Sequence, residues 1–223
     1  MSAAQPVKLK IDFVSDIACP WCAIGLHALE QAADNVKDQV QVDLHFQPFE
    51  LNSDMVPEGE DVIEHLQRKY GAPADQLAKT QDAIAERGAA LGFQFNMGKR
   101  TRIYNTFDAH RLLHWMDEEG TSEQQRALKH ALFTAYFTDG QNTSDHAVLL
   151  AVVRKLGLDE ARAKAILESD EYAQDVRERE AFYHQHGINS VPAVIINDRH
   201  LIQGGQPVEA FEQALRQIAQ QSA

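Results

Sequence analysis

Hydrophobic and polar residues alternate along two short stretches near the start of the chain, residues 8–14 and residues 40–47. A period of two residues is typical of a β-strand with one buried face. Between these stretches, apolar residues from Trp21 onward recur at helical spacing, and Pro20 suits a first helical turn because its missing N–H has no partner there. The opening of the chain therefore predicts a β-α-β unit whose second strand ends at Pro48.

From about residue 60 to residue 186, the composition becomes typical of helices. This segment is rich in Ala, Leu, Glu, Gln, Lys and Arg, with glycines at intervals. We expect about five to seven helices there, one capped by Ser144 and another beginning at Asp159. The charged run from Glu171 to Glu180 predicts a solvated helical face rather than a binding site.

A strand pattern returns at residues 191–196. Asn197-Asp198 follows as a turn, and residues 201–202 offer a short partner strand, which together predict a β-hairpin. After Pro207, apolar residues line one face of a final amphipathic helix. The end of the chain thus adds two strands and one helix to the predicted fold.

The strand-and-helix pattern at the two ends of the chain is interrupted by the helical middle. We therefore predict one α/β domain built from residues 1–48 and 187–223, with residues 49–186 as an inserted helical domain. A chain of 223 residues, 44% of them hydrophobic, can bury a core of this size without disulfide support.

The charge of the chain excludes several classes of partner. Its 21 Lys and Arg residues against 33 Asp and Glu give a net charge of −12, so we expect neither a nucleic-acid partner nor an anionic membrane surface. Apolar runs fall short of the roughly 18 residues that span a bilayer. The first twenty residues lack the apolar stretch of a secretory signal, and we expect a cytoplasmic protein.

The chain has two cysteines, Cys19 and Cys22, at the predicted junction of strand and helix. Residues three apart on a first helical turn lie close enough to form a disulfide. A cysteine at the helix N-terminus is also favoured as a thiolate by unpaired backbone N–H groups. This spacing predicts Cys19 as the nucleophile and Cys22 as the thiol that resolves the mixed disulfide.

A zinc site is the main alternative for the cysteine pair. A structural zinc ion needs four ligands, usually with a second Cys or His pair at short spacing. His184 and His186, the one histidine pair only two residues apart, lie at a predicted helix end. We therefore favour redox chemistry and expect no metal site.

Four segments of the sequence resemble the DsbA family of the thioredoxin superfamily. Within that family they are most similar to the FrnE-like branch, often described as 2-hydroxychromene-2-carboxylate isomerase-like. The resemblance covers nearly the whole chain and implies a thioredoxin-like α/β fold with a large all-helical insertion. The segments are Ser-Asp-Ile-Ala-Cys-Pro-Trp-Cys at 15–22, Gln-Pro-Phe-Glu-Leu-Asn at 47–52, Asn-Thr-Phe-Asp-Ala-His-Arg-Leu at 105–112 and Tyr-Phe-Thr-Asp-Gly at 136–140.

The resemblance also implies roles for particular residues. Cys19 and Cys22 would form the redox-active disulfide. The bond between Val191 and Pro192 would be cis and would face the cysteine pair, so that these two residues and Trp21 contact the substrate.

The function predicted from these features is thiol–disulfide exchange with protein or small-molecule thiols and disulfides. No tightly bound cofactor is expected, and glutathione is a candidate redox partner. By analogy, Arg102 and Asn105 are candidates to bind a tripeptide thiol, with helix capping or a surface position as the alternative.

Two other functions stay open. One is a glutathione-dependent isomerase or transferase acting on an aromatic small molecule. The family members with that chemistry have serine where this chain has Cys19, which disfavours it. The other is a peptide-binding or chaperone module that uses the groove beside the insertion.

Overall fold

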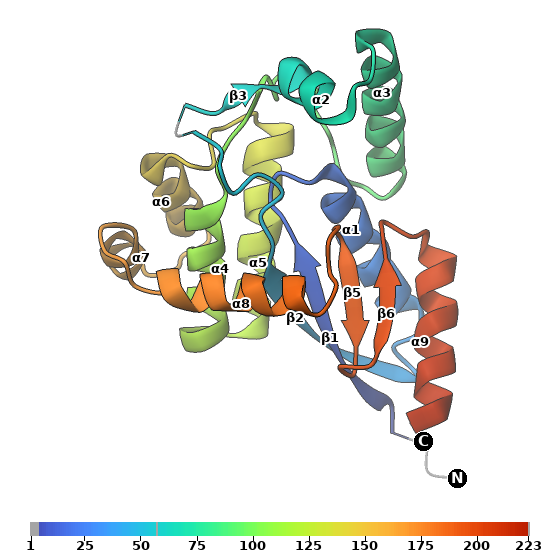
Figure 1. The fold of residues 1–223 in the computed structure, drawn as a ribbon. Helices are drawn as coiled ribbons and strands as arrows, with labels where there is room; N and C mark the ends of the chain where they lie inside the picture. Colours follow the sequence, from blue (N-terminus) through green and yellow to red (C-terminus); the bar gives the residue numbers. More distant parts are fainter. Residues whose placement is uncertain (1–4, 57, 223) are drawn as a thin grey trace.

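The computed structural model describes residues 5–56 and 58–222 of the chain. Within these residues, the chain forms a four-stranded sheet with the strand order β2-β1-β5-β6 (Figure 1). The first two strands are parallel, and β5 pairs antiparallel with β1 and with β6. The predicted β-α-β unit and hairpin are both present. The strands are β1 Val7–Ser15, β2 Val40–Pro48, β5 Ala193–Ile196 and β6 His200–Gln203.

Seven α-helices lie between β2 and β5 in the described part of the chain, at the upper limit of the prediction. A π-helical turn, η1 (Thr134–Thr138), continues one of them, and two short strands, β3 (Glu60–Asp61) and β4 (Arg102–Ile103), form a small antiparallel pair that the sequence pattern did not predict. The α-helices are α1 Pro20–Asn35, α2 Val62–Tyr70, α3 Ala74–Ala90, α4 Phe107–Glu119, α5 Ser122–Phe133, α6 His146–Lys155, α7 Glu160–Leu167, α8 Ala173–Gln185 and α9 Val208–Ser222.

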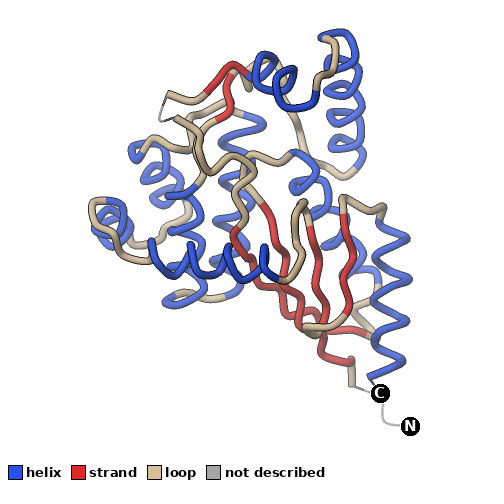
Figure 2. The backbone as a smooth tube through the Cα atoms, in the orientation of Figure 1, coloured by secondary structure: helices blue, strands red, loops and turns tan. Residues whose placement is uncertain are grey.

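Helices cover both faces of the sheet (Figure 2). On one face, α1 and α9 pack against each other, α1 contacts β2, and α9 contacts β1, whose Leu9, Ile11 and Phe13 are fully buried. On the other face, α8 covers a smaller apolar cluster. β1 is therefore buried on both sides near its carboxyl end, where the cysteine loop begins. The cluster under α8 comprises Val14, Phe49, Tyr183, Ile188 and Ala193.

Three of the predictions concern the hairpin turn and the N-termini of two helices. Asn197 and Asp198 both have positive φ, 52° and 55°, in the three-residue turn 197–199 that joins Ile196 to its partner His200. Asp159 caps α7 as predicted, through a bond from the Arg162 N–H. The predicted Ser144 cap is wrong by one residue, because the Asp145 carboxylate accepts the Ala147 N–H in the first turn of α6 instead.

The charged run at residues 171–180 is not uniformly solvated, contrary to the prediction. Because α8 lies against the sheet, part of this run is covered. Glu180 is buried and forms an ion pair with Arg177. The division into an α/β domain and an inserted helical domain stays a prediction, since α4, α5 and α8 all contact β2.

Candidate active site

The two cysteines lie at the start of α1, where β1 delivers the chain to the helix. Cys19 is the N-cap residue, with extended backbone angles and no side-chain hydrogen bond to the helix. The thiol groups are not joined by a disulfide. Cys19 is 4% exposed, whereas Cys22 is fully buried one turn inside. Only Cys19 is therefore placed to meet a substrate first.

The loop before β5 faces the Cys19 sulfur. The Val191–Pro192 bond is cis, and the Cys19 Sγ lies 3.7 Å from the Val191 carbonyl oxygen. Pro192 packs on the second turn of α1 because Gly25 has no side chain there. A Cβ atom at Gly25 would lie 3.0 Å from the proline Cγ. The structure thus brings together residues 172 positions apart in the chain.

Trp21 is half-buried between the two cysteines and is held from α3. The Arg87 guanidinium lies 5.4 Å from the centre of its ring, and the Arg87 Nη2 donates to the Gly205 carbonyl at 2.8 Å. The indole is consequently fixed against the side of the site, where it lines the space above Cys19.

A buried carboxylate, Asp16, holds the cysteine loop in place. It accepts hydrogen bonds from the Ala18 N–H at 3.2 Å, the Leu51 N–H at 2.7 Å and the Thr106 hydroxyl at 2.7 Å, and His110 lies 3.5 Å away. Burial raises the pKa of Asp16, but the interaction with His110 and the other hydrogen bonds outweigh it, so the pKa is lowered.

Opposing effects act on the pKa of the Cys22 thiol. Burial raises the pKa of Cys22 well above its ordinary value, and the neighbouring Cys19 raises it further. A hydrogen bond with the Asp16 backbone and the positive charge of Lys129 lower it. The effects that raise the pKa of Cys22 outweigh those that lower it, and Cys22 is held as a thiol.

Lys129, on α5, is a fully buried lysine that the sequence analysis missed. Its Nζ has no hydrogen-bond partner among the described residues, and it lies 5.0 Å from the centre of the Phe133 ring. Burial lowers the pKa of Lys129 to about 8, while electrostatic interactions with Cys22, Asp16 and Cys19 oppose that effect. Its ammonium group thus contributes positive charge behind the cysteine pair.

A cavity of about 770 Å³ opens above Cys19. Its floor is formed by residues 18–21, its sides by residues 49–52 and 189–191, and its roof by α2 and α3, which lie above the end of β1 in Figure 1. Its volume and its largely apolar lining are typical of a small-molecule site.

One carboxylate lies in the wall of this cavity. Burial and the nearby Glu180 carboxylate raise the pKa of Glu50 to about 7, although Arg177 forms an ion pair with it. Glu50 belongs to the segment at 47–52 that carries part of the family resemblance, which is the one sequence feature that pointed to it.

Arg102 and Asn105 do not line the cavity, so the hypothesis that they bind a tripeptide thiol is wrong. Arg102 donates to the carbonyl oxygens of Glu58 and Gly59, at 2.9 and 2.7 Å. The Asn105 side chain accepts the Phe107 N–H at the start of α4. Arg100, two positions earlier in the chain, lines the cavity instead.

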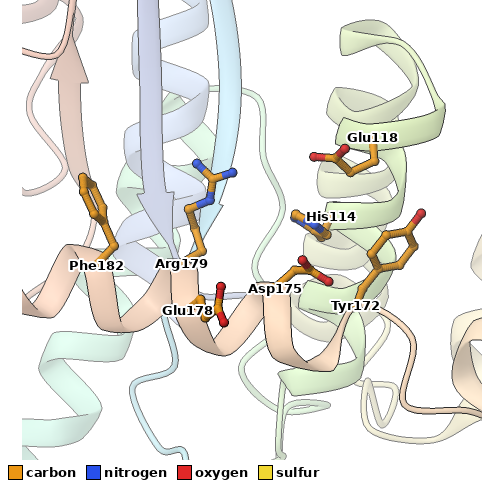
Figure 3. Close-up of a pocket in the computed structure, with 7 residues that line it drawn as sticks. All are labelled: His114, Glu118, Tyr172, Asp175, Glu178, Arg179 and Phe182. Carbon is orange, nitrogen blue, oxygen red and sulfur yellow. The ribbon is translucent and has the colours of Figure 1, made fainter.

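A second hollow, of about 390 Å³, lies between α4 and α8 (Figure 3). It contains neither cysteine and none of the predicted site residues, so it offers no thiol chemistry. The residues around the hollow are His114, Glu118, Tyr172, Asp175, Glu178, Arg179 and Phe182.

No group of three or more His, Cys, Asp or Glu residues in the described chain could hold a metal ion, so Cys19 and Cys22 have no third ligand there for a zinc ion.

Replacing Asp16 by Asn should lower the free energy of unfolding by about 2–4 kcal/mol at neutral pH. One of the two buried oxygens that accept hydrogen bonds is then replaced by an NH₂ group, which can only donate. The pKa of Asp16 is lowered by folding, so its contribution is complete above about pH 4 and disappears as pH falls through the folded-state pKa. Urea unfolding of both proteins at neutral and acidic pH measures this difference. Equal destabilisation at both pH values would contradict the assignment, and Thr106→Val serves as a control that removes one bond.

Replacing Lys129 by Met should raise the pKa of Cys22 further and slow the resolving step about tenfold near neutral pH. The reduced protein is mixed with dithiobis(nitrobenzoate), and the second release of coloured thiolate reports the attack by Cys22. Arg126→Met, which removes an exposed charge from the same helix, is the matched control. An unchanged pH profile of the second release in the Lys129 variant would show that the ammonium has no effect on Cys22.

Solved structures of similar fold cover almost all of this chain. A probable DsbA oxidoreductase from Streptomyces coelicolor has a TM-score of 0.87 and 31% sequence identity, covering 96% of this chain and 91% of that one. The cytosolic disulfide reductase DsbM from Pseudomonas aeruginosa, crystallised with GSH, has a TM-score of 0.64 at 15% identity and covers 95% and 99%. A 2-hydroxychromene-2-carboxylate isomerase has a TM-score of 0.71 at 15% identity and covers 96% and 97%. The last two show similarity of fold.

The sequence comparisons agree with the structural ones. The uncharacterized protein YwbO of Bacillus subtilis (strain 168) is 30% identical over 212 residues, which are 94% of this chain and 96% of that protein. The family model described as the DSBA-like thioredoxin domain matches residues 10–216. The resemblance drawn from the four sequence segments is confirmed, and the chain belongs to the DSBA-like thioredoxin domain family.

Proposed function

We propose that this protein is a thiol–disulfide oxidoreductase that uses Cys19 as nucleophile and Cys22 as resolving thiol. The observation that carries the proposal is that the two cysteines, both at the start of α1, are buried to different depths. Cys19 forms part of the floor of the large cavity, and Cys22 is sealed beneath it. Exchange through a mixed disulfide needs one thiol that meets the substrate and a second that attacks afterwards.

The reaction proceeds in two exchanges when a disulfide is reduced. The Cys19 thiolate attacks one sulfur of the substrate, an S–S bond forms between them, and the first substrate thiolate leaves. Cys22 then loses its proton and attacks the Cys19 Sγ, which releases the second substrate thiolate and leaves a Cys19–Cys22 disulfide. The protein loses two electrons to the substrate, and a thiol reductant restores the dithiol. The reverse sequence oxidises a dithiol.

The charges around the pair support this order. While Cys19 is a thiolate, its charge adds to the effect of burial in raising the pKa of Cys22. Formation of the mixed disulfide neutralises Cys19, and the effect of Lys129 on Cys22 is then less opposed. The second exchange is therefore favoured only after the first has occurred.

The roof over Cys19 supports small thiols and disulfides as partners. Helices α2 and α3 cover the cavity, whose volume of about 770 Å³ accommodates a tripeptide such as glutathione. DsbM, crystallised with GSH, has this fold and is named as a cytosolic reductase. We propose glutathione as a diffusible partner, with Trp21, Val191 and Pro192 contacting the substrate beside Cys19, and a cytoplasmic site for the reaction.

Replacing Cys19 by Ser should abolish the rapid reaction of the reduced protein with dithiobis(nitrobenzoate), because the remaining thiol is buried. Replacing Cys22 by Ser should leave the first exchange intact and trap a mixed disulfide on Cys19. Absorbance of the released thiolate and intact-protein mass spectrometry measure both outcomes. Undiminished reactivity in the Cys19 variant would refute the assignment of the nucleophile.

The isomerase alternative is tested on the same variants. A glutathione-dependent isomerase would need no resolving thiol, so conversion of a chromene carboxylate would continue after Cys22→Ser. We expect no such conversion by either protein, because this chain has a thiol at position 19.

A further inference from the structure

Arg100 is a buried cation in the wall of the cavity, and it forms no ion pair with any described Asp or Glu. Only 5% of its surface is exposed. A guanidinium group does not lose its proton in proteins, so it cannot escape the cost of burial by becoming neutral. A buried charge without a counter-ion is unfavourable for the folded protein alone.

The contacts of Arg100 fix the orientation of its guanidinium group. The Nε donates to the Tyr136 hydroxyl at 3.0 Å, and the Nη2 lies 3.5 Å from the Ala18 carbonyl oxygen. The rings of Tyr136 and Phe137 are each centred 5.2 Å from the Cζ. These bonds use two of the five N–H donors. The Nη1 has no hydrogen-bond partner among the described residues and is not sealed inside the protein, so this nitrogen is accessible where Arg100 lines the cavity.

The same contacts place the guanidinium group against the backbone that leads into Cys19. The carbonyl oxygen of Ala18 belongs to the peptide unit that leads into Cys19. An anion bound by Arg100 would therefore lie beside Cys19, inside the cavity rather than at its outer rim.

The other charged groups of the cavity do not neutralise Arg100. Glu50 is the only carboxylate among the described residues that line the cavity, and Arg177 on α8 already pairs with it. Lys69 adds a second cation, which donates to the Leu51 carbonyl at 2.9 Å. The other titratable residues that line the cavity are Cys19, His65, Tyr70 and His184. A chain with a net charge of −12 thus presents permanent cations around its reactive thiol.

We propose that the cavity selects small anionic thiols and disulfides, whose carboxylate pairs with Arg100 while their sulfur meets Cys19. This inference rests on the proposed function and narrows its substrate class. Arginine suits the task because its planar fork can donate two parallel hydrogen bonds to one carboxylate.

Rate constants for a set of disulfides test the inference. Reduced wild-type and Arg100→Met proteins react with two anionic disulfides, dithiobis(nitrobenzoate) and oxidised glutathione, and with two neutral ones, dithiodipyridine and hydroxyethyl disulfide. We expect the variant to lose about 10- to 100-fold in rate with the anionic disulfides. The rates with the neutral disulfides should change by less than about threefold. Arg100→Lys should recover part of the loss, since it keeps the charge without the fork.

Arg102→Met is the matched control. It removes the same charge two positions along the chain, where the guanidinium contacts the carbonyl oxygens of Glu58 and Gly59 rather than the cavity. Its rates should match the wild type for every disulfide. An equal loss with neutral and anionic disulfides in Arg100→Met would overturn the proposal, because a role in stability or in charging Cys19 acts on all substrates alike.

Binding of S-methylglutathione separates this proposal from the proposed function. This thioether carries two carboxylates but cannot exchange disulfides, and calorimetry measures its affinity for each folded variant. We expect about 10-fold or greater weakening in Arg100→Met and none in Arg102→Met. Equal affinities would overturn the carboxylate site even if disulfide exchange is present. Selective binding without any exchange by Cys19 would support the site and refute the oxidoreductase.

Discussion

The buried carboxylate of Asp16 is the group on which the geometry of the thiol site depends. Its partners come from three parts of the chain: the loop that carries the cysteines, the segment after β2 through Leu51, and the start of α4 through Thr106 and His110. A buried charge tolerates little movement, since a shift leaves it without hydrogen bonds. Asp16 therefore fixes the position of Cys19 relative to the helical segment above it.

The two thiols have different environments because they lie at different depths in the protein. The Cys-Pro-Trp-Cys sequence alone does not create this difference. Cys22 is fully buried, and its environment combines the cost of desolvation with the opposing charge of Lys129. The charge of Lys129 comes from α5, in the middle of the chain. The helical segment thus contributes to the electrostatics of the cysteine pair and also provides the roof of the cavity.

Sequence patterns could predict the sheet, the hairpin and the cysteine pair, because hydrophobic periodicity, turn-forming residues and the spacing of the cysteines are local properties of the sequence. They could not predict Lys129 or Glu180, since helical periodicity does not show which face of a helix another segment will cover. For a related reason, the sequence could not show that Arg100 lines the cavity and Arg102 does not. The pairing of Arg102 in the two-residue strand β4 directs it to a loop, and so short a strand leaves no pattern in the sequence.

The candidate site is assembled from distant parts of the chain. Asp16, Arg100 and Lys129 acquire their contacts with the cysteine loop only when α4, α5 and the segment before β4 are docked. The environment of the two thiols is therefore a property of the complete tertiary structure, and a peptide that contained only the cysteine motif would lack it.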